Sequence, residues 1–200
     1  ELQSNYKAHN YDTNKFTNFF VNDFDFESKE SVFKDFLNSK VLVNLKNINY
    51  ESKNVDIYKE NPTSEIFGSL GFLSQINLQK IKENSLYSLK PKILLRAAPG
   101  SMRQEENSSK LTPDNAFNMN RVSNINNYET GLSGAVGVDY KIKNNNKTKF
   151  DFSLAQVINK KENKKMSDKS SLNEKLSDLV GSSSFNITEN LNLNYNFSVD

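Results

Sequence analysis

The side chains that could do acid–base or metal chemistry are few and scattered along this 200-residue chain. His9 is its only histidine and lies in a polar N-terminal stretch, and the absence of cysteine excludes disulfides and thiolate metal sites. Carboxylates such as Asp23, Asp25, Glu105 and Glu106 follow no metal-ligand spacing, and the sequence contains no glycine-rich phosphate loop. We therefore expect no catalytic, metal or cofactor site, and we interpret His9 and these carboxylates as solvated surface groups.

The composition excludes several classes of protein. With 36% hydrophobic and 25% charged residues and a mean hydropathy of -0.70, the chain is polar for a globular domain, yet 14 phenylalanines and 8 tyrosines are too many for a disordered one. No run approaches the roughly 18 apolar residues that a membrane helix needs. The net charge of +2 and the scattered lysines do not predict nucleic-acid binding. The chain can cross a membrane only with β-strands, whose alternating pattern keeps the mean hydropathy low.

Residues 128–142 have the clearest structural signal. Apolar residues such as Leu132 and Val136 alternate with small or polar ones, which is the pattern of a strand with one apolar and one polar face. Three glycines in this stretch disfavour a helix. Tyr128 and Tyr140 bracket the apolar face, as aromatic rings do at the two interfaces of a membrane-spanning strand. An ordinary half-buried strand of a soluble protein is the alternative for this stretch alone.

The same alternation recurs along the chain and predicts about eight strands. In residues 16–26 the even-numbered phenylalanines share one face, while Phe19 and Val21 share the other. Residues 40–50 are β-branched, but the pattern leaves their facing open. The predicted strands cover residues 16–26, 40–50, 64–78, 86–97, 128–142, 149–158, 175–188 and 191–199.

Three segments have a weaker pattern. Apolar residues at helical spacing, including Phe33 and Phe36, predict a short helical turn within residues 27–39. Residues 116–121 are predicted to form a further short strand. Pro91 counts against a central strand at residues 86–97, because it lacks the N–H group that such a strand donates, and a bulge or a nearby turn would accommodate it.

The connections between the predicted strands alternate in length. Short turns are expected near Glu83, Asn145 and Glu189, and long connections over residues 51–63, 98–127 and 159–174. Short turns on one side and long loops on the other are typical of an outer-membrane barrel, whereas a soluble sandwich has no reason to sort its loops. The sorting weakens at residues 27–39. We expect the long 98–127 stretch to be an exposed or functional loop.

The second half of the chain contains five short sequence blocks in a fixed order. They are LRAAPGSMR (95–103), AFNMNR (116–121), YETGLSGAVGVDYK (128–141), SLAQVI (153–158) and SDLVG (177–181). In this order they resemble the barrel domain of the lipopolysaccharide-assembly family LptD, also called OstA, and the resemblance covers about residues 89–181. Ala98 and Ala155 depart from the family pattern by small-for-small changes.

The resemblance implies an all-β fold, the wall of an antiparallel transmembrane β-barrel, with residues 1–200 as a partial barrel domain in the outer membrane of a Gram-negative bacterium. It implies lipopolysaccharide transport and insertion without enzymatic activity or a cofactor. The implied partners are lipopolysaccharide, an LptE-like plug lipoprotein in the lumen, outer-membrane lipid, and a periplasmic lipopolysaccharide-bridge protein that binds a domain absent here. The missing initiator methionine and a final segment that stops within an alternating pattern predict a piece of a longer chain.

Two groups of residues are predicted to contact these partners. The first lies on or next to polar faces, where it is expected to line the lumen and meet the plug lipoprotein; the alternative is that it only keeps the interior wet. It consists of Arg96, Arg121, Glu129 and Asp139. The second is a basic loop expected to touch lipid A phosphates, with a merely solvated charge run as the alternative. It consists of Lys160, Lys161, Lys164, Lys165 and Lys169.

Two other functions remain open at this point. A general porin has the same alternation, but it has a complete set of strands and a lumen without a plug, and the order of the five blocks argues against it. A soluble all-β binding module would expose its polar face and would not need detergent.

Overall fold

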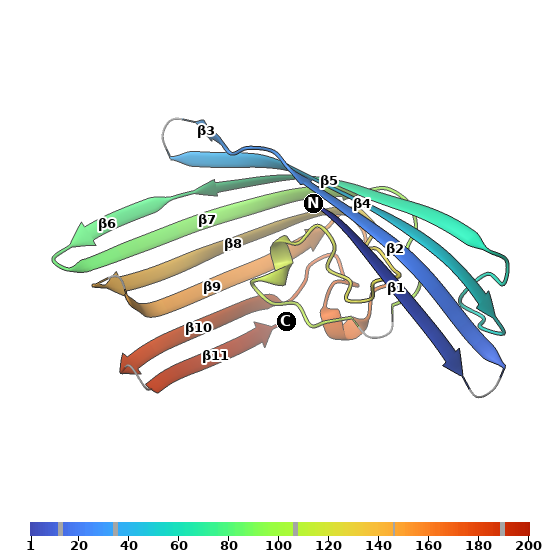
Figure 1. The fold of residues 1–200 in the computed structure, drawn as a ribbon. Coiled ribbons are helices and arrows are strands. Elements are labelled where there is room, and N and C mark those ends of the chain that lie inside the picture. The colour runs from blue at the N-terminus through green and yellow to red at the C-terminus, as the bar shows by residue number, and fades with distance from the viewer. Residues whose placement is uncertain (12–13, 34–35, 106–107, 146, 189–190) are drawn as a thin grey trace.

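The computed structural model describes residues 1–11, 14–33, 36–105, 108–145, 147–188 and 191–200. They form one antiparallel, curved sheet of eleven strands in the order β1-β2-β4-β5-β7-β8-β9-β10-β11, with β3 beside β4 and β6 beside β7 (Figure 1). The antiparallel all-β class is therefore confirmed. The strands are β1 (Leu2–Tyr11), β2 (Lys15–Glu27), β3 (Ser31–Phe33), β4 (Leu37–Lys53), β5 (Thr63–Ile76), β6 (Leu78–Lys82), β7 (Ser85–Ala98), β8 (Gly131–Asn144), β9 (Lys147–Asn159), β10 (Leu179–Thr188) and β11 (Leu191–Val199).

The sheet is open in the described residues. β1 pairs with β2 at one side and β11 with β10 at the other, and no ladder joins β1 to β11. Three strands, β1, β3 and β6, add to the about eight that the alternation predicts. The polar β1 forms because it extends the ladder of β2, whose residues 15–24 face it in register. No helix of the described residues is long and apolar enough to cross a membrane.

The strands divide the molecule into an outer and an inner face. In β2, Phe19 and Val21 are buried on the inner face while Phe20 and Phe24 are exposed on the outer face, as their positions in the alternation predict. In β8, Leu132 and Val136 are on the outer face. The open question of β4 is answered in the same way, because its inner face mixes apolar with polar residues while its outer face is apolar from Val41 to Leu45 and polar from Asn47 onward. The inner residues of β4 are Leu42, Asn44, Lys46, Ile48, Tyr50 and Ser52.

Two of the weaker predictions are wrong. Ser31–Phe33 is a strand and not a helical turn, because the long β4 extends past β2 and offers Leu37–Ser39 as a pairing edge; residues 34–35 lie outside the described part. Residues 116–121 are not a strand. Asn115–Phe117 is a short 3-10 helix, η1, which follows a turn closed by reciprocal bonds. The Asn115 N–H donates to Thr112 Oγ1 at 3.2 Å, and the Thr112 N–H donates to Asn115 Oδ1 at 2.8 Å.

Pro91 lies within β7 without a bulge. It pairs with Val138 of β8 on one side. On the other side the ladder to β5 ends at Lys92 and the ladder to β6 begins at Leu89, so that Pro91 lies at the break between the two. The missing N–H group therefore leaves no ladder bond unmade, which explains why a central strand tolerates this proline.

The connections are sorted by length as predicted over most of the sheet. The turns β6–β7, β8–β9 and β10–β11 lie together at one end, and the long connections follow β4, β7 and β9 at the other end (Figure 1). The paired ends of β1 and β2, Tyr11 and Lys15, are an exception, because they lie at the end of the long loops (Figure 1). Residues 146, 189 and 190, parts of two predicted turns, lie outside the described part.

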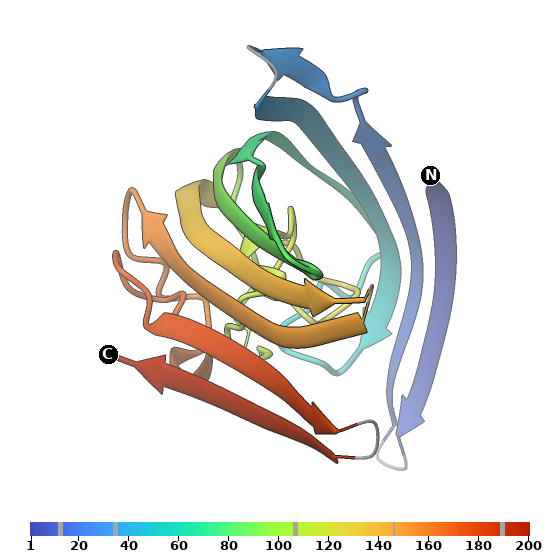
Figure 2. The ribbon, with the colours of Figure 1, turned by 90° about the vertical axis from the view of Figure 1, so that its left-hand side faces the viewer.

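The long connection between β7 and β8, residues 99–130, is called the inner segment below. Its described residues, 99–105 and 108–130, do not extend into solvent, so of the two expectations for this stretch, an exposed or a functional loop, the exposed one is wrong. It lies inside the curve of the sheet (Figure 2), where Leu111, Ala116 and Val122 are buried in one cluster with Leu94 and Ala135 of the sheet. Buried hydrophobic area, rather than regular secondary structure, therefore orders this segment.

Candidate functional site at the inner face

An ion pair between Arg121 and Glu129 joins two parts of the inner segment. Arg121 Nε donates to Glu129 Oε2 at 2.7 Å, and its Nη2 donates to Glu129 Oε1. The Arg121 backbone N–H also donates to Oε2, at 3.3 Å. Only 1% of the Arg121 side chain and 4% of the Glu129 side chain is exposed. The two residues thus form a bidentate, charge-assisted pair that closes the end of the segment.

Arg96 connects the sheet to this pair. It lies near the end of β7 on the inner face, and its Nε donates to the Met119 carbonyl oxygen at 2.6 Å. Its Nη2 donates to the Glu129 carbonyl oxygen, and its Nη1 lies 3.7 Å from Glu129 Oε1. The guanidinium also lies 5.9 Å from the centre of the Tyr128 ring. One residue of the sheet therefore holds the inner segment at three of its positions.

The charges of the site favour an ionised carboxylate at Glu129. Burial by itself raises the pKa of this group, but the positive charges of Arg121 and Arg96 and the hydrogen bonds from Arg121 lower it, so that the resulting pKa is below the ordinary value. Removing one partner of such a buried group is costly, because it leaves another charge unpaired away from water. Arg96, Arg121 and Glu129, called the inner ion cluster below, therefore favour one conformation of the inner segment.

Tyr128 is part of the same site and not of a membrane interface, so its predicted outward position is wrong. It is fully buried, stacks on Phe67 with ring centres 5.9 Å apart, and shares a hydrogen bond between its hydroxyl and Ser69 Oγ. Burial raises the pKa of this hydroxyl. The alternation fails here because β8 begins only at Gly131, whose φ of 126° turns the chain between Tyr128 and the strand.

Asp139 belongs to a different cluster on the inner face. Its Oδ2 lies 2.9 Å from Lys92 Nζ, and its Oδ1 accepts a hydrogen bond from Ser153 Oγ at 2.9 Å. Lys92 Nζ also lies 4.4 Å from the centre of the Phe117 ring. The structure therefore brings together three of the four predicted lumen residues and pairs the fourth with a lysine. With 31% of its side chain exposed, Asp139 is more accessible than the other three.

Arg103 is a contact residue of the inner segment that the sequence analysis did not single out. Its Nη1 donates to the Asn126 carbonyl oxygen at 2.6 Å, and its Nη2 forms an ion pair with Glu65 of β5. Its guanidinium lies 4.9 Å from the centre of the Tyr50 ring and 5.4 Å from that of Tyr58. Arg103 therefore binds the beginning of the segment to β4 and β5, as Arg96 binds its end to β7.

Two inward-facing glycines were a signal for this covered face. A Cβ at Gly137 would lie 2.5 Å from the Leu154 carbonyl oxygen of β9 and 2.9 Å from Phe117 Cζ, and a Cβ at Gly71 would lie 2.5 Å from Met119 Sδ. Phe117 and Met119 belong to the inner segment, so both glycines let the segment approach the sheet closely. The alternation in the sequence places these glycines on strand faces without large side chains at those positions. It does not predict which segment covers these faces.

All five lysines of the basic loop are exposed, as a lipid-contacting or solvated loop requires. The loop is nevertheless anchored, because Met166 and Leu172 are buried in the same cluster as the inner segment. Lys165 Nζ donates to Ser101 Oγ at 2.7 Å, and the Lys165 carbonyl oxygen accepts from the Glu105 N–H at 2.8 Å. The structure therefore fixes the position of the loop relative to the inner face.

The acidic residues considered for chemistry are only partly solvated. Glu105 is 3% exposed and accepts a hydrogen bond from Asn127 Nδ2 at 3.0 Å, and Asp23 pairs with Lys46 at 3.1 Å, so neither is a free surface group. Asp25 and His9 are exposed, and Glu106 lies outside the described residues. Within the described part of the chain, no group of three or more His, Cys, Asp or Glu side chains could hold a metal ion. Arg96 and Arg103 position the inner segment on the sheet.

Comparison with known protein families agrees with the five sequence blocks. A family model described as LPS transport system D, LptD, matches residues 61–200, which is more than half of the chain. The chain belongs to the LptD family. The part matched by the LptD model runs from just before β5 to the end of the chain and contains the whole inner ion cluster, whereas the blocks alone resemble the family over residues 89–181. No individual curated protein matches the chain.

Proposed function

We propose that this chain is part of the wall of an outer-membrane β-barrel of a Gram-negative bacterium that transports lipopolysaccharide and inserts it into the outer leaflet. The observation that carries this proposal is the apolar outer face of the curved sheet, opposite an inner face that mixes apolar with polar and charged residues and is covered by the inner segment. A contiguous exposed apolar surface requires a cover, and acyl chains cover the wall of a barrel. Membership in the LptD family supports lipopolysaccharide as the cargo. The apolar residues of the outer face include Leu70, Phe72, Ile93, Leu95, Leu132, Val136 and Ile158.

Aromatic residues at the short-turn end of the outer face support a membrane position. Tyr140 and Phe150 lie with ring centres 6.2 Å apart, and Phe150 and Phe185 lie 6.3 Å apart, so that one row of rings crosses β8, β9 and β10. Amphipathic and aromatic side chains favour the membrane–water interface, and outer-membrane barrels have aromatic girdles there. Short turns in these barrels face the periplasm, so the inner segment and the basic loop would lie toward the cell exterior.

The inner face would line the lumen, and we propose that an LptE-like plug lipoprotein contacts it. The inner ion cluster is occupied with holding the inner segment, so among the four predicted lumen residues Asp139 has the most surface left for a partner. The basic loop would contact lipid A phosphates at the cell surface. A periplasmic bridge protein would bind a domain outside these residues.

Co-purification tests this function. The full-length protein is extracted from the outer membrane in detergent, with a photo-crosslinking residue at Asp139 and, as a matched control, at the adjacent Val138 on the outer face. The expected result is co-purification of a plug lipoprotein that crosslinks to position 139 but not to position 138. A barrel without this partner would favour the porin, and a protein that is soluble without detergent would favour the all-β binding module.

A second experiment tests the basic loop. Replacing all five lysines by glutamine removes the attraction to phosphate groups, which is worth about 1 kcal/mol per lysine near a membrane surface. We expect a higher permeability of the outer membrane to a large hydrophobic antibiotic, with unchanged amounts of barrel. Unchanged permeability would show that the lysines are only a solvated charge run.

A further inference from the structure

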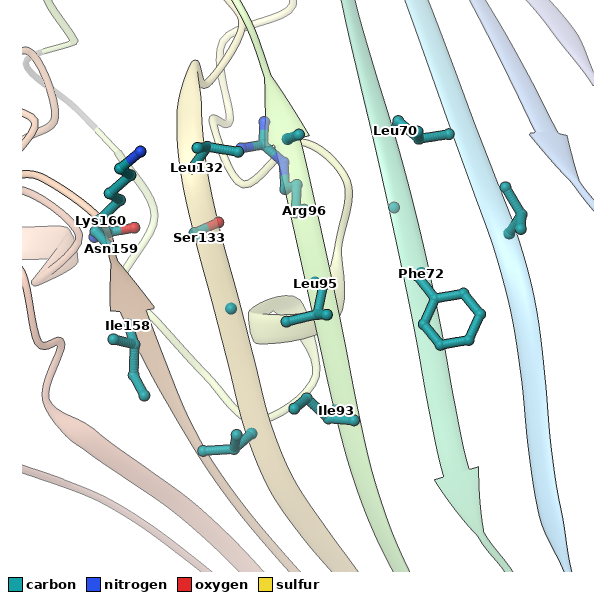
Figure 3. Close-up of a pocket in the computed structure, with 15 residues that line it drawn as sticks. Leu70, Phe72, Ile93, Leu95, Arg96, Leu132, Ser133, Ile158, Asn159 and Lys160 are labelled. Carbon is teal, nitrogen blue, oxygen red and sulfur yellow. The ribbon is translucent and has the colours of Figure 1, made fainter.

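The outer face contains a furrow of about 730 Å³ at the long-loop end of β5, β7, β8 and β9 (Figure 3). This volume is within the roughly 300–1,000 Å³ of sites that bind small molecules. Its walls are large aliphatic and aromatic side chains, among them Leu70, Phe72, Leu95, Leu132 and Ile158. The furrow is therefore a local hollow in the surface that the proposed function assigns to lipid.

Two small residues form its floor. Ala97 lies between Leu70 and Leu132 of the neighbouring strands. Gly134 lies between Leu95 and Ile158. Ala97 pairs with Leu132, and Leu95 pairs with Gly134, so Ala97 and Gly134 are diagonal neighbours on the outer face. The spaces above these two small residues therefore join into one furrow.

The contacts within the chain do not require a glycine at position 134. Its φ is not in the left-handed region, which among the described glycines only Gly100 and Gly131 adopt. A Cβ at Gly134 would lie 3.6 Å from the Leu94 carbonyl oxygen and 3.7 Å from Leu95 Cδ2, both ordinary contacts. This distinguishes it from Gly137, where the inner segment fills the space. The room above Gly134 is open to the outside.

A lysine lies at the long-loop end of the furrow. The Lys160 backbone N–H donates to the Leu132 carbonyl oxygen at 2.9 Å, which fixes this residue beside the furrow wall. Its side chain lines the furrow and is exposed. The neighbouring Asn159 is used within the chain, because its Nδ2 donates to the Leu172 and Glu174 carbonyl oxygens at 3.1 and 2.7 Å. The ammonium group of Lys160 is thus the cationic end of an otherwise apolar hollow.

We propose that this furrow binds one acyl chain of a membrane lipid that carries a phosphate, with the phosphate on Lys160 and the chain lying over Ala97 and Gly134. The inference rests on the proposed function, because it requires the outer face to lie in lipid. An aliphatic hollow with one exposed cation at its end matches the chemistry of such a lipid, in which an anionic headgroup is joined to an alkyl tail. Arg96 also borders the hollow, but its guanidinium donates to the inner segment on the other face of the sheet. The lysine is at the end where the long loops place the outer leaflet.

Photolabelling of the full-length protein in phosphatidylcholine vesicles tests the proposal. The probes are phosphatidic acid and, as the neutral control, diacylglycerol, each with a diazirine on one acyl chain, and labelled peptides are mapped by mass spectrometry. We expect phosphatidic acid to label furrow residues of β7 and β8 more than diacylglycerol does. Lys160→Gln should lower this preference about fivefold, as the loss of one lysine near the surface predicts. Lys59→Gln, the matched control, should leave it unchanged, because Lys59 is an exposed lysine of the 51–63 connection that lies outside both the furrow and the basic loop.

A second pair of variants tests the shape of the furrow. Gly134→Val fills the floor with a residue that a lipid-facing strand accepts, and it should abolish labelling in the furrow. Val138→Phe, on the same strand and face but outside the furrow, should not. Uniform labelling of the whole outer face, with no effect of Lys160→Gln or Gly134→Val, would overturn the furrow site but keep the lipid-facing wall. No labelling anywhere on the outer face would instead overturn the proposed function.

Discussion

The inner ion cluster makes one strong prediction, for Glu129→Gln. The substitution keeps the shape of the side chain but removes the charge that Arg121 and Arg96 share, and it places an amide donor opposite guanidinium donors. Breaking a buried pair by removing one partner costs about 3–5 kcal/mol. The lower cost, about 3 kcal/mol, applies if the glutamine keeps one of the three hydrogen bonds from Arg121. A cost of about 3 kcal/mol corresponds to a roughly 150-fold larger open fraction of the inner segment.

Hydrogen exchange of the full-length protein in detergent measures this opening. The reporting amides are in the inner segment, for example that of Ala116, which donates to the Thr112 carbonyl oxygen at 3.0 Å. We expect their protection to fall about 150-fold in Glu129→Gln, while amides of the β2–β4 ladder keep theirs. Glu162→Gln, at an exposed glutamate of the basic loop, is the matched control. If the inner segment kept its full protection without the Glu129 charge, the ion cluster would not be what holds it.

Three further predictions concern the same face and the opposite one. The pKa of Glu129 is lowered in the folded chain, so the stability that its ionised carboxylate contributes is complete above the ordinary glutamate pKa of about 4.3 and is lost as the pH falls through the lower folded pKa. Hydrogen exchange corrected for intrinsic rates should therefore show opening of the inner segment only below about pH 4. Glu129→Gln should remove this pH dependence. Tyr128→Phe should lower the free energy of unfolding in urea by about 1 kcal/mol, because it leaves the buried Ser69 hydroxyl without this partner. Tyr128→Ala, which also removes the stacked ring, should lower it by about 3–5 kcal/mol. Equal losses of stability would mean that the stacked ring contributes nothing. Val136→Arg should destabilise the protein by about 2–4 kcal/mol in lipid vesicles if it faces the bilayer interior, and Asn144→Arg at the exposed strand end by less than about 1 kcal/mol; a neutral Val136→Arg would place the outer face in water.

The facing of the strands could be predicted from the sequence because side chains alternate across a sheet regardless of what surrounds it. Phe19 and Val21 against Phe20 and Phe24 in β2, and Leu132 and Val136 in β8, needed only their positions in the chain. Where apolar residues occupied both positions, as in β4, the alternation gave no answer. The contacts of the inner segment then decided which face is covered.

The site was predictable in its residues but not in its arrangement. Arg96, Arg121 and Glu129 were selected as polar groups on or near polar faces, and the structure brings them together. Asp139 was selected by the same reasoning, and it pairs with Lys92 instead. Tyr128 was misplaced because alternation was extended beyond Gly131, where the strand begins.

By itself, the sequence determined an antiparallel sheet with an apolar outer face, the end of the sheet at which most long loops lie, and the blocks that resemble the family. Each of these features depends only on the spacing of residues that are close together in the chain. Only the tertiary structure decided that residues 99–130 fold against the inner face. That outcome depends on contacts between residues far apart in the chain, such as Arg103 with Glu65 and Arg96 with Glu129. An irregular segment has no periodicity to reveal such contacts, because its order comes from burial and ion pairs rather than from repeating backbone hydrogen bonds.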